Sequence, residues 1–126
     1  MNDTSELRNE LGQFTCAEKY YFNPLNRSIY YTDGAKFFFE NAGNGAYWLL
    51  DILITQPEIL KALSREGFLC VTLTVTKDAT AVLDVANDSG PGATVYYRRE
   101  LDYTDCPAGE WRLYMIDNVI LLSSEY

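Results

Sequence analysis

The chain predicts an α+β fold, with N-terminal helices packed on one face of a C-terminal antiparallel meander of about five strands. Two observations support this fold class. Before Gly67, apolar residues recur at helical spacing. After Gly67, apolar residues such as Leu69 and Val71 alternate with polar ones, as in strands that bury one face.

Helices are expected over residues 3–13, 33–41, 46–55 and 58–64. In the second helix, Thr32 or Asp33 is expected to accept hydrogen bonds from the free amides of the first turn. In the third helix apolar residues surround the axis, so the helix and its Trp48 are expected to be buried. Pro57 and Gly67 are typical of the start and the end of the fourth helix.

Strands are expected over residues 69–76, 80–85, 94–101, 111–116 and 119–122, and residues 19–22 and 28–31 also look extended. In the third of these strands, alternation places Tyr96 and Arg98 on one face of the sheet and Tyr97 and Arg99 on the other. No composition shift marks a linker, so residues 1–126 are expected to form a single domain.

The side-chain inventory excludes several kinds of chemistry. The chain has no histidine, which is the commonest general base near neutral pH and the commonest metal ligand. Cys16, Cys70 and Cys106 are too widely spaced for a zinc site, and Cys106 before Pro107 is the best candidate for an exposed thiol. Gly43-Asn44-Gly45 lacks the residues of a phosphate-binding loop. We therefore expect no catalytic residue, cofactor or metal, and a protein that is not an enzyme.

The ends and the apolar segments indicate a cytoplasmic protein. The first residues are polar and lack the basic region of a signal peptide, and the odd cysteine count fits a reducing compartment. The apolar stretch 47–50 is interrupted by Asp51, so no membrane span is expected.

The net charge of −8 opposes direct binding to nucleic acid and favours a basic protein partner, although it also serves solubility. The net negative charge is denser after Glu66, in the sheet half of the chain, where nine acids and four bases compare with nine acids and six bases before Gly67. The candidate partner-binding residues lie in the loops of that half, and they are Asp102, Asp105, Glu110, Asp84 and Asp88.

Several motifs together resemble a known family. Pro24-Leu25-Asn26-Arg27, Tyr31-Thr32-Asp33-Gly34, the segment 46–51 (Ala-Tyr-Trp-Leu-Leu-Asp) and the closing Leu-Leu-Ser-Ser-Glu-Tyr of residues 121–126 are similar to a family of small bacterial proteins of unknown function. That family is often found on plasmids, phages and other mobile elements. The resemblance supplies no catalytic residues, and it implies an accessory protein acting on host machinery.

Three interpretations follow. The first is a non-enzymatic protein-binding protein, with an inhibitor that blocks a nucleic-acid-handling host factor through its acidic surface as its most specific form. The second is a small-ligand-binding protein or an enzyme that uses carboxylates and tyrosines. The third is a protein that self-associates through an open sheet edge.

Overall fold

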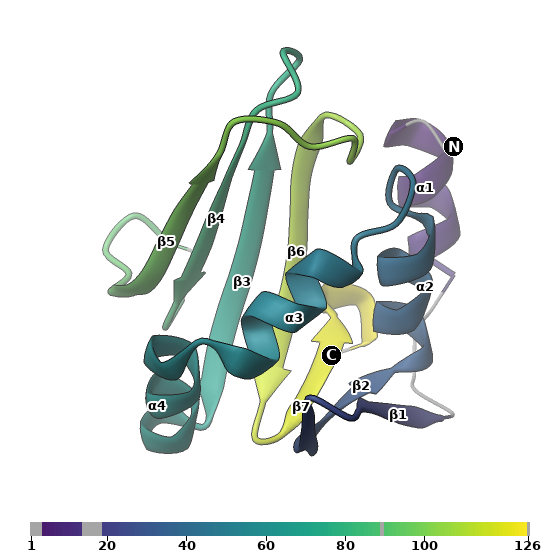
Figure 1. Ribbon diagram of the computed structural model, residues 1–126. Helices are drawn as coiled ribbons and strands as arrows, with labels where there is room; N and C mark the ends of the chain where they lie inside the picture. Colours follow the sequence, from purple (N-terminus) through teal and green to yellow (C-terminus); the bar gives the residue numbers. More distant parts are fainter. Residues whose placement is uncertain (1–3, 14–18, 89, 126) are drawn as a thin grey trace.

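Four helices lie on the same side of a single sheet in the computed structural model, which describes residues 4–13, 19–88 and 90–125 (Figure 1). The helices are α1 (Thr4–Leu11), α2 (Asp33–Asn41), α3 (Tyr47–Thr55) and α4 (Pro57–Glu66). The α+β class and the placement of the helices before the main strands are confirmed. No helix in the described part of the chain has the length and apolar character that a membrane crossing requires.

The ends of α2 and α4 follow the local chemistry that the sequence predicts, whereas the start of α3 has no side-chain cap. The Thr32 side chain accepts a hydrogen bond from the amide of Ala35 at 3.1 Å, which confirms the predicted cap of α2. α4 begins at Pro57 and ends at Gly67, whose φ of 72° is the left-handed conformation that glycine tolerates. α3 starts at Tyr47, and its N-cap residue Ala46 makes no side-chain hydrogen bond.

The sheet has seven strands rather than about five, because both short extended segments before α2 join it. In chain order the strands are β1 (Tyr20–Asn23), β2 (Asn26–Thr32), β3 (Phe68–Val75), β4 (Ala81–Ala86), β5 (Val95–Leu101), β6 (Gly109–Ile116) and β7 (Val119–Leu122). A 3₁₀ turn over Ser123–Glu125 follows β7.

The strand order is β1-β2-β7-β6-β3-β4-β5, so the expected meander is correct only for the runs β3-β4-β5 and β6-β7. The loop that follows β5 crosses the end of the sheet (Figure 1), and β6 then pairs with β3 along eight residues, from Phe68↔Ile116 to Val75↔Gly109. β5 is thereby left at one edge of the sheet. β7 pairs in parallel with β2, and this contact joins the N-terminal hairpin to the other strands.

The core lies between the helices and the sheet. Leu69, Val71, Leu73 and Val75 of β3 are all buried against the helical layer, as their alternation predicts. The residues between them, with the matching residues of the neighbouring strands, form the outer face of the sheet, on the side away from the helices.

One strand departs from strict alternation. The pairing of β5 with β4 shifts between Val85 and Ala86, so β5 carries a bulge next to Tyr96. Tyr96 and Tyr97 therefore both pack against the core instead of lying on opposite faces. Beyond the bulge, Arg98 and Arg99 alternate as predicted.

Candidate functional site

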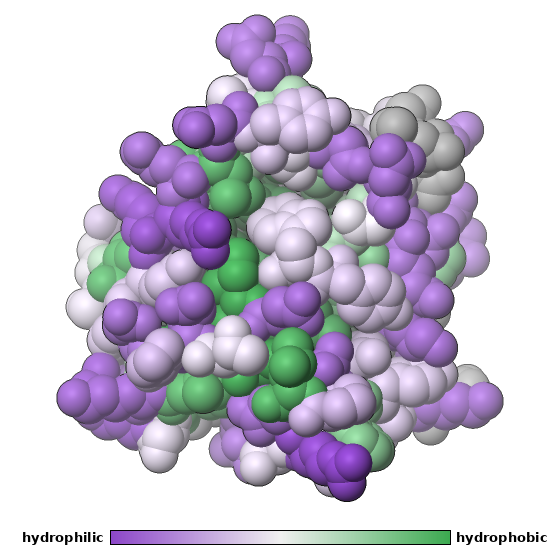
Figure 2. Space-filling model, viewed as in Figure 1, coloured by the Kyte–Doolittle hydropathy of each residue, from purple (hydrophilic) through white to green (hydrophobic). Residues whose placement is uncertain are grey.

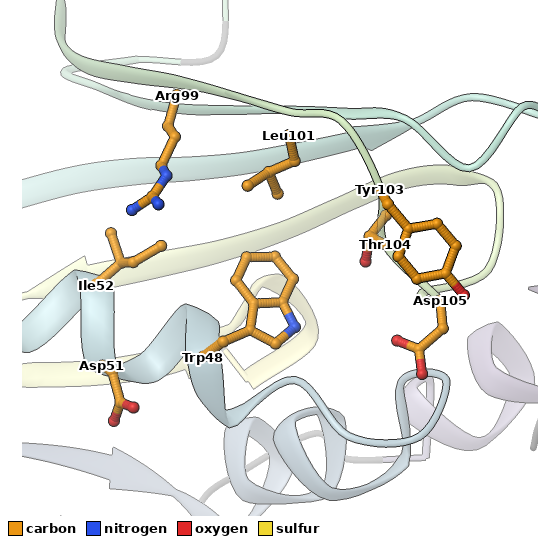
Figure 3. Close-up of a pocket in the computed structure, with 8 residues that line it drawn as sticks. All are labelled: Trp48, Asp51, Ile52, Arg99, Leu101, Tyr103, Thr104 and Asp105. Atoms are coloured by element: carbon orange, nitrogen blue, oxygen red, sulfur yellow. The ribbon is translucent and has the colours of Figure 1, made fainter.

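A cleft of about 550 Å³ lies between α3 and the strand-loop segment that ends β5. Figure 3 shows the Trp48 ring in its middle, with Arg99 on one side of the ring and Tyr103 and Asp105 on the other. From the same viewpoint, Figure 2 shows apolar side chains reaching the surface between hydrophilic ones in the middle of the helix side. The cleft is lined by Trp48, Asp51, Ile52, Arg99, Leu101, Tyr103, Thr104 and Asp105.

Trp48 is half-buried, which corrects the expectation that the whole of α3 lies in the core. Leu49 and Leu50 are fully buried, whereas Asp51 is exposed, so α3 has a solvent side along which Trp48 and Asp51 lie. The indole N–H of Trp48 makes no hydrogen bond to any residue that the structure describes. Its ring is available to a ligand.

The triplet Tyr103-Thr104-Asp105 forms the opposite wall. Thr104 is buried, and its amide donates to the carbonyl of Ala79 at 2.8 Å while its hydroxyl accepts from the amide of Cys106 at 3.2 Å. The first bond fixes the loop against the turn between β3 and β4, and the second holds the shape of the loop itself. Tyr103 beside them is 73% exposed, a large solvent exposure for an aromatic ring on a fixed loop.

Asp105 ties the loop to the corner between α2 and α3. Its Oδ2 accepts a hydrogen bond from the amide of Asn44 at 2.9 Å. Gly43, with φ of 61°, lies so close to the Asp105 backbone that a Cβ there would come within 2.3 Å of the Asp105 carbonyl oxygen. The glycine-rich corner therefore serves this contact, and one carboxylate oxygen of Asp105 remains for other partners.

Arg99 and its neighbour Arg98 have different roles. Arg98 points to the outer face, where its Nε donates to Asp84 at 2.6 Å. Arg99 lies on the helix side at the end of the cleft, is exposed, and has no ion pair among the described residues. Its guanidinium is therefore available to an acceptor group of a ligand.

The five predicted partner-binding acids fall into two places. Asp105 lines the cleft, and Asp102 is exposed on the same loop. Asp84, Asp88 and Glu110 line a second hollow, of about 390 Å³, that includes residues of the outer face. There Asp84 is paired with Arg98 and Glu110 with Arg112, so the charge of these two acids is balanced locally.

The first triplet, Tyr31-Thr32-Asp33, has a structural role. The Thr32 hydroxyl donates to Oε1 of Glu125 at 2.6 Å, and the same Oε1 accepts from the amide of Leu122 at 2.9 Å. Gly34 leaves room for this carboxylate, because a Cβ there would lie 2.5 Å from Oε1. The contact joins the start of α2 to the end of the described chain.

Both cysteines that the structure describes are buried, which corrects the expectation of an exposed thiol at Cys106. Burial, helped by the nearby Asp105, raises the pKa of Cys106 to about 12. Burial also raises the pKa of Cys70. Cys16 lies outside the described residues. The thiols of Cys70 and Cys106 stay protonated and unreactive near neutral pH.

No group of three or more acidic or thiol side chains within the described ranges is arranged to hold a metal ion. The cleft offers a different kind of chemistry: two aromatic rings, two carboxylates and one guanidinium, none of them occupied by an ion pair within the described part of the chain. Two sequence signals point to the cleft: the segment 46–51, whose apolar pattern places Trp48 in the core, and Asp105, which is one of the candidate partner-binding residues.

The match to a family model covers residues 5–126, and the description of that family is a family of unknown function, DUF6876. The chain belongs to the DUF6876 family. No curated protein and no solved structure matches it. All eight residues that line the cleft lie within the region matched to DUF6876.

Proposed function

We propose that this DUF6876 chain is a protein-binding module that holds a positively charged segment of its partner in the Trp48 cleft. The observation that carries the proposal is the pairing of two accessible aromatic rings, Trp48 and Tyr103, with the carboxylate of Asp105 beside them. A lysine or arginine side chain fits this end of the cleft, because cations are attracted to aromatic faces and to carboxylates together.

The other end of the cleft sets the orientation of the bound segment. Arg99 lies across the Trp48 ring from Asp105 and presents donors that match a carboxylate or a backbone carbonyl. A segment with a basic side chain and an acceptor group one or two residues away satisfies both ends. Leu101 and Ile52 supply apolar wall for the methylene stem of the basic side chain.

The charge of the whole chain supports the same kind of partner. A net charge of −8 attracts basic proteins and raises the rate at which they meet the chain. Host proteins that handle nucleic acid bind it in basic grooves. The more specific proposal is therefore that this chain is a mobile-element protein that inhibits such a host factor in the cytoplasm. In that form the partner's nucleic acid competes with binding.

Tryptophan fluorescence tests the proposal directly. The chain has two tryptophans, and Trp111 is only 4% exposed, so a ligand in the cleft changes mainly the emission of Trp48. Capped tetralysine and tetra-arginine peptides are titrated against capped tetraglutamate. We expect a saturable change with the basic peptides and none with the acidic one.

Two variants locate the binding. Tyr103→Ala removes a 73% exposed ring and should weaken binding at least fivefold while leaving the melting temperature unchanged. Tyr20→Ala removes a 58% exposed ring from the far edge of the sheet and is the matched control. Equal binding by wild type and Tyr103→Ala, or equal binding of basic and acidic peptides, would overturn the proposal.

A further inference from the structure

The two edges of the sheet are protected very differently. At one edge, β5 carries a bulge and three consecutive charged residues, Arg98, Arg99 and Glu100, which discourage pairing with another strand. At the other edge, β1 has the sequence Tyr-Tyr-Phe-Asn, with no charge and no proline. Its outer side has no strand neighbour among the described residues.

The unprotected edge continues into an apolar row on the outer face. Residues paired across five neighbouring strands follow one another in register: Phe22, Tyr30, Val119, Ile116 and Phe68. All five lie on the face opposite to the helices of Figure 1, because the residues next to them in each strand point into the core. The row is most exposed at its β1 end, where Tyr20 is 58%, Phe22 50% and Tyr30 42% exposed.

The charge at this edge differs from that of the molecule. Residues 19–32 contain Lys19 and Arg27 and no acidic residue, in a chain of net charge −8. Two copies of an acidic chain repel each other least where their acidic residues are farthest apart. The β1–β2 hairpin is such a place.

We propose that β1 pairs with β1 of a second copy of the chain, in antiparallel fashion about a two-fold axis at Tyr21. A two-fold interface places the same surface of both copies together. Opposed residues of antiparallel strands share a face, so a two-fold axis that passes through a residue of β1 keeps the two outer faces continuous. The axis at Tyr21 is the one that pairs the two exposed rings of β1, because it places Tyr20 opposite Phe22 of the second copy and Tyr21 opposite itself.

This register covers the most exposed rings. Tyr20 and Phe22 of each copy form two aromatic cross-strand pairs on the outer face, which are among the more favourable pairs in sheets. The two apolar rows then join into one band that crosses both sheets. This inference is independent of the cleft, which lies on the helix side next to the opposite edge.

Molar mass measured against concentration tests the pairing. We expect the mass to rise from 14.4 kDa towards twice that value as concentration increases. Phe22→Lys places a charge at the pairing edge and should raise the dimer dissociation constant at least tenfold. Val95→Lys places the same charge at a 42% exposed position of β5 and should leave the constant unchanged. A mass that stays at 14.4 kDa at every concentration, or equal effects of the two variants, would overturn the proposal.

Disulfide trapping tests the register. Tyr20→Cys and Phe22→Cys are made separately, each with Cys16→Ser so that this thiol cannot compete; Cys70 and Cys106 are buried. Opposed residues have Cα atoms about 4.5–5.5 Å apart, within reach of a disulfide. The mixture of the two variants should therefore form a covalent dimer on mild oxidation, and neither variant alone should. A covalent dimer of either variant alone, or none in the mixture, contradicts this register.

Discussion

The two tryptophans occupy environments that give their truncation different effects on stability. Trp111 is 4% exposed, its indole N–H donates to the carbonyl of Pro107 at 2.8 Å, and its ring packs on Phe38 and under the guanidinium of Arg8. Trp111→Ala should lower the free energy of unfolding by about 3–5 kcal/mol, the usual range for a core aromatic. Trp48→Ala should lower it by only about 1–2 kcal/mol, because the ring is already half in water.

Urea denaturation of the two variants measures this difference, with Tyr103→Ala as a control that should match wild type. The deciding result is whether Trp111→Ala lowers the free energy of unfolding more than Trp48→Ala does. If Trp48→Ala were as costly as Trp111→Ala, Trp48 would belong to the core and the cleft would be closed.

Cys106 makes stability depend on alkaline pH. Its pKa is raised in the folded state to about 12, so its contribution is fully present below the unfolded thiol's pKa and is lost as pH rises towards 12. Each pH unit above about 8.5 should therefore lower the free energy of unfolding of the wild-type protein by roughly 1 kcal/mol. The Cys106→Ala variant should not show this loss. Urea denaturation of both proteins at pH 7.5 and 9.5 measures the difference. Parallel losses in the two proteins would show that this thiol is solvated.

At the scale of elements, the start of α2 is held by a contact that sequence propensity does not reveal. Alanine is normally preferred to glycine inside a helix by about 0.5–1 kcal/mol. At Gly34, however, the added Cβ would displace the Glu125 carboxylate, which accepts from Thr32 and from the Leu122 amide. Gly34→Ala should therefore destabilise the protein, by about 1–2 kcal/mol.

A double-mutant cycle isolates the cause. In a Glu125→Ala background the carboxylate is gone, so the same Gly34→Ala change should become neutral or stabilising. A destabilisation of equal size in both backgrounds would mean that the carboxylate is not what the methyl group meets. Thermal or urea denaturation of the four proteins gives the comparison.

Local patterns predicted the elements well, because each pattern depends on neighbouring residues. The alternation from Leu69 to Val75 identified β3 and its core face, and Pro57 and Gly67 marked both ends of α4. Strand order failed, because alternation says which face a residue occupies but not which strand lies next to it. The pairing of β6 with β3 joins segments some forty residues apart in the chain.

The cleft was missed for a related reason. The apolar neighbours of Trp48 in the sequence predict that it lies in the core. How much of its ring is exposed depends on where residues 103–105, far away in the sequence, cross the end of the sheet. The bulge at Tyr96 likewise depends on the partner strand β4 and has no signal in β5 itself. The sequence shows which residues are acidic, but it does not show that Asp84 and Glu110 form ion pairs with neighbouring arginines, which balance their charge.

At the scale of the whole molecule, the two proposed surfaces respond to the same net charge in opposite ways. In the proposed function the cleft, which Asp51 and Asp105 line, takes a cation, so the affinity would depend on attraction to a chain of net charge −8. Pairing through β1 brings together two chains that carry this same charge. Attraction at one surface and repulsion at the other are both screened by salt, over about 10 Å at 0.1 M.

Raising the ionic strength should therefore weaken binding of the tetralysine peptide and strengthen self-association. Both dissociation constants are measured over one salt series, from about 0.02 to 0.5 M, over which the Debye length falls from roughly 20 Å to roughly 4 Å. The peptide constant should rise at least tenfold, because the attraction to a tetravalent cation is mostly long-range. The dimer constant should fall severalfold, because salt screens the repulsion between the two chains and leaves the apolar contacts at Tyr20 and Phe22 unaffected. If both constants moved in the same direction, at least one of the two surfaces would have been assigned the wrong partner, and the Tyr103→Ala and Phe22→Lys variants would show which one.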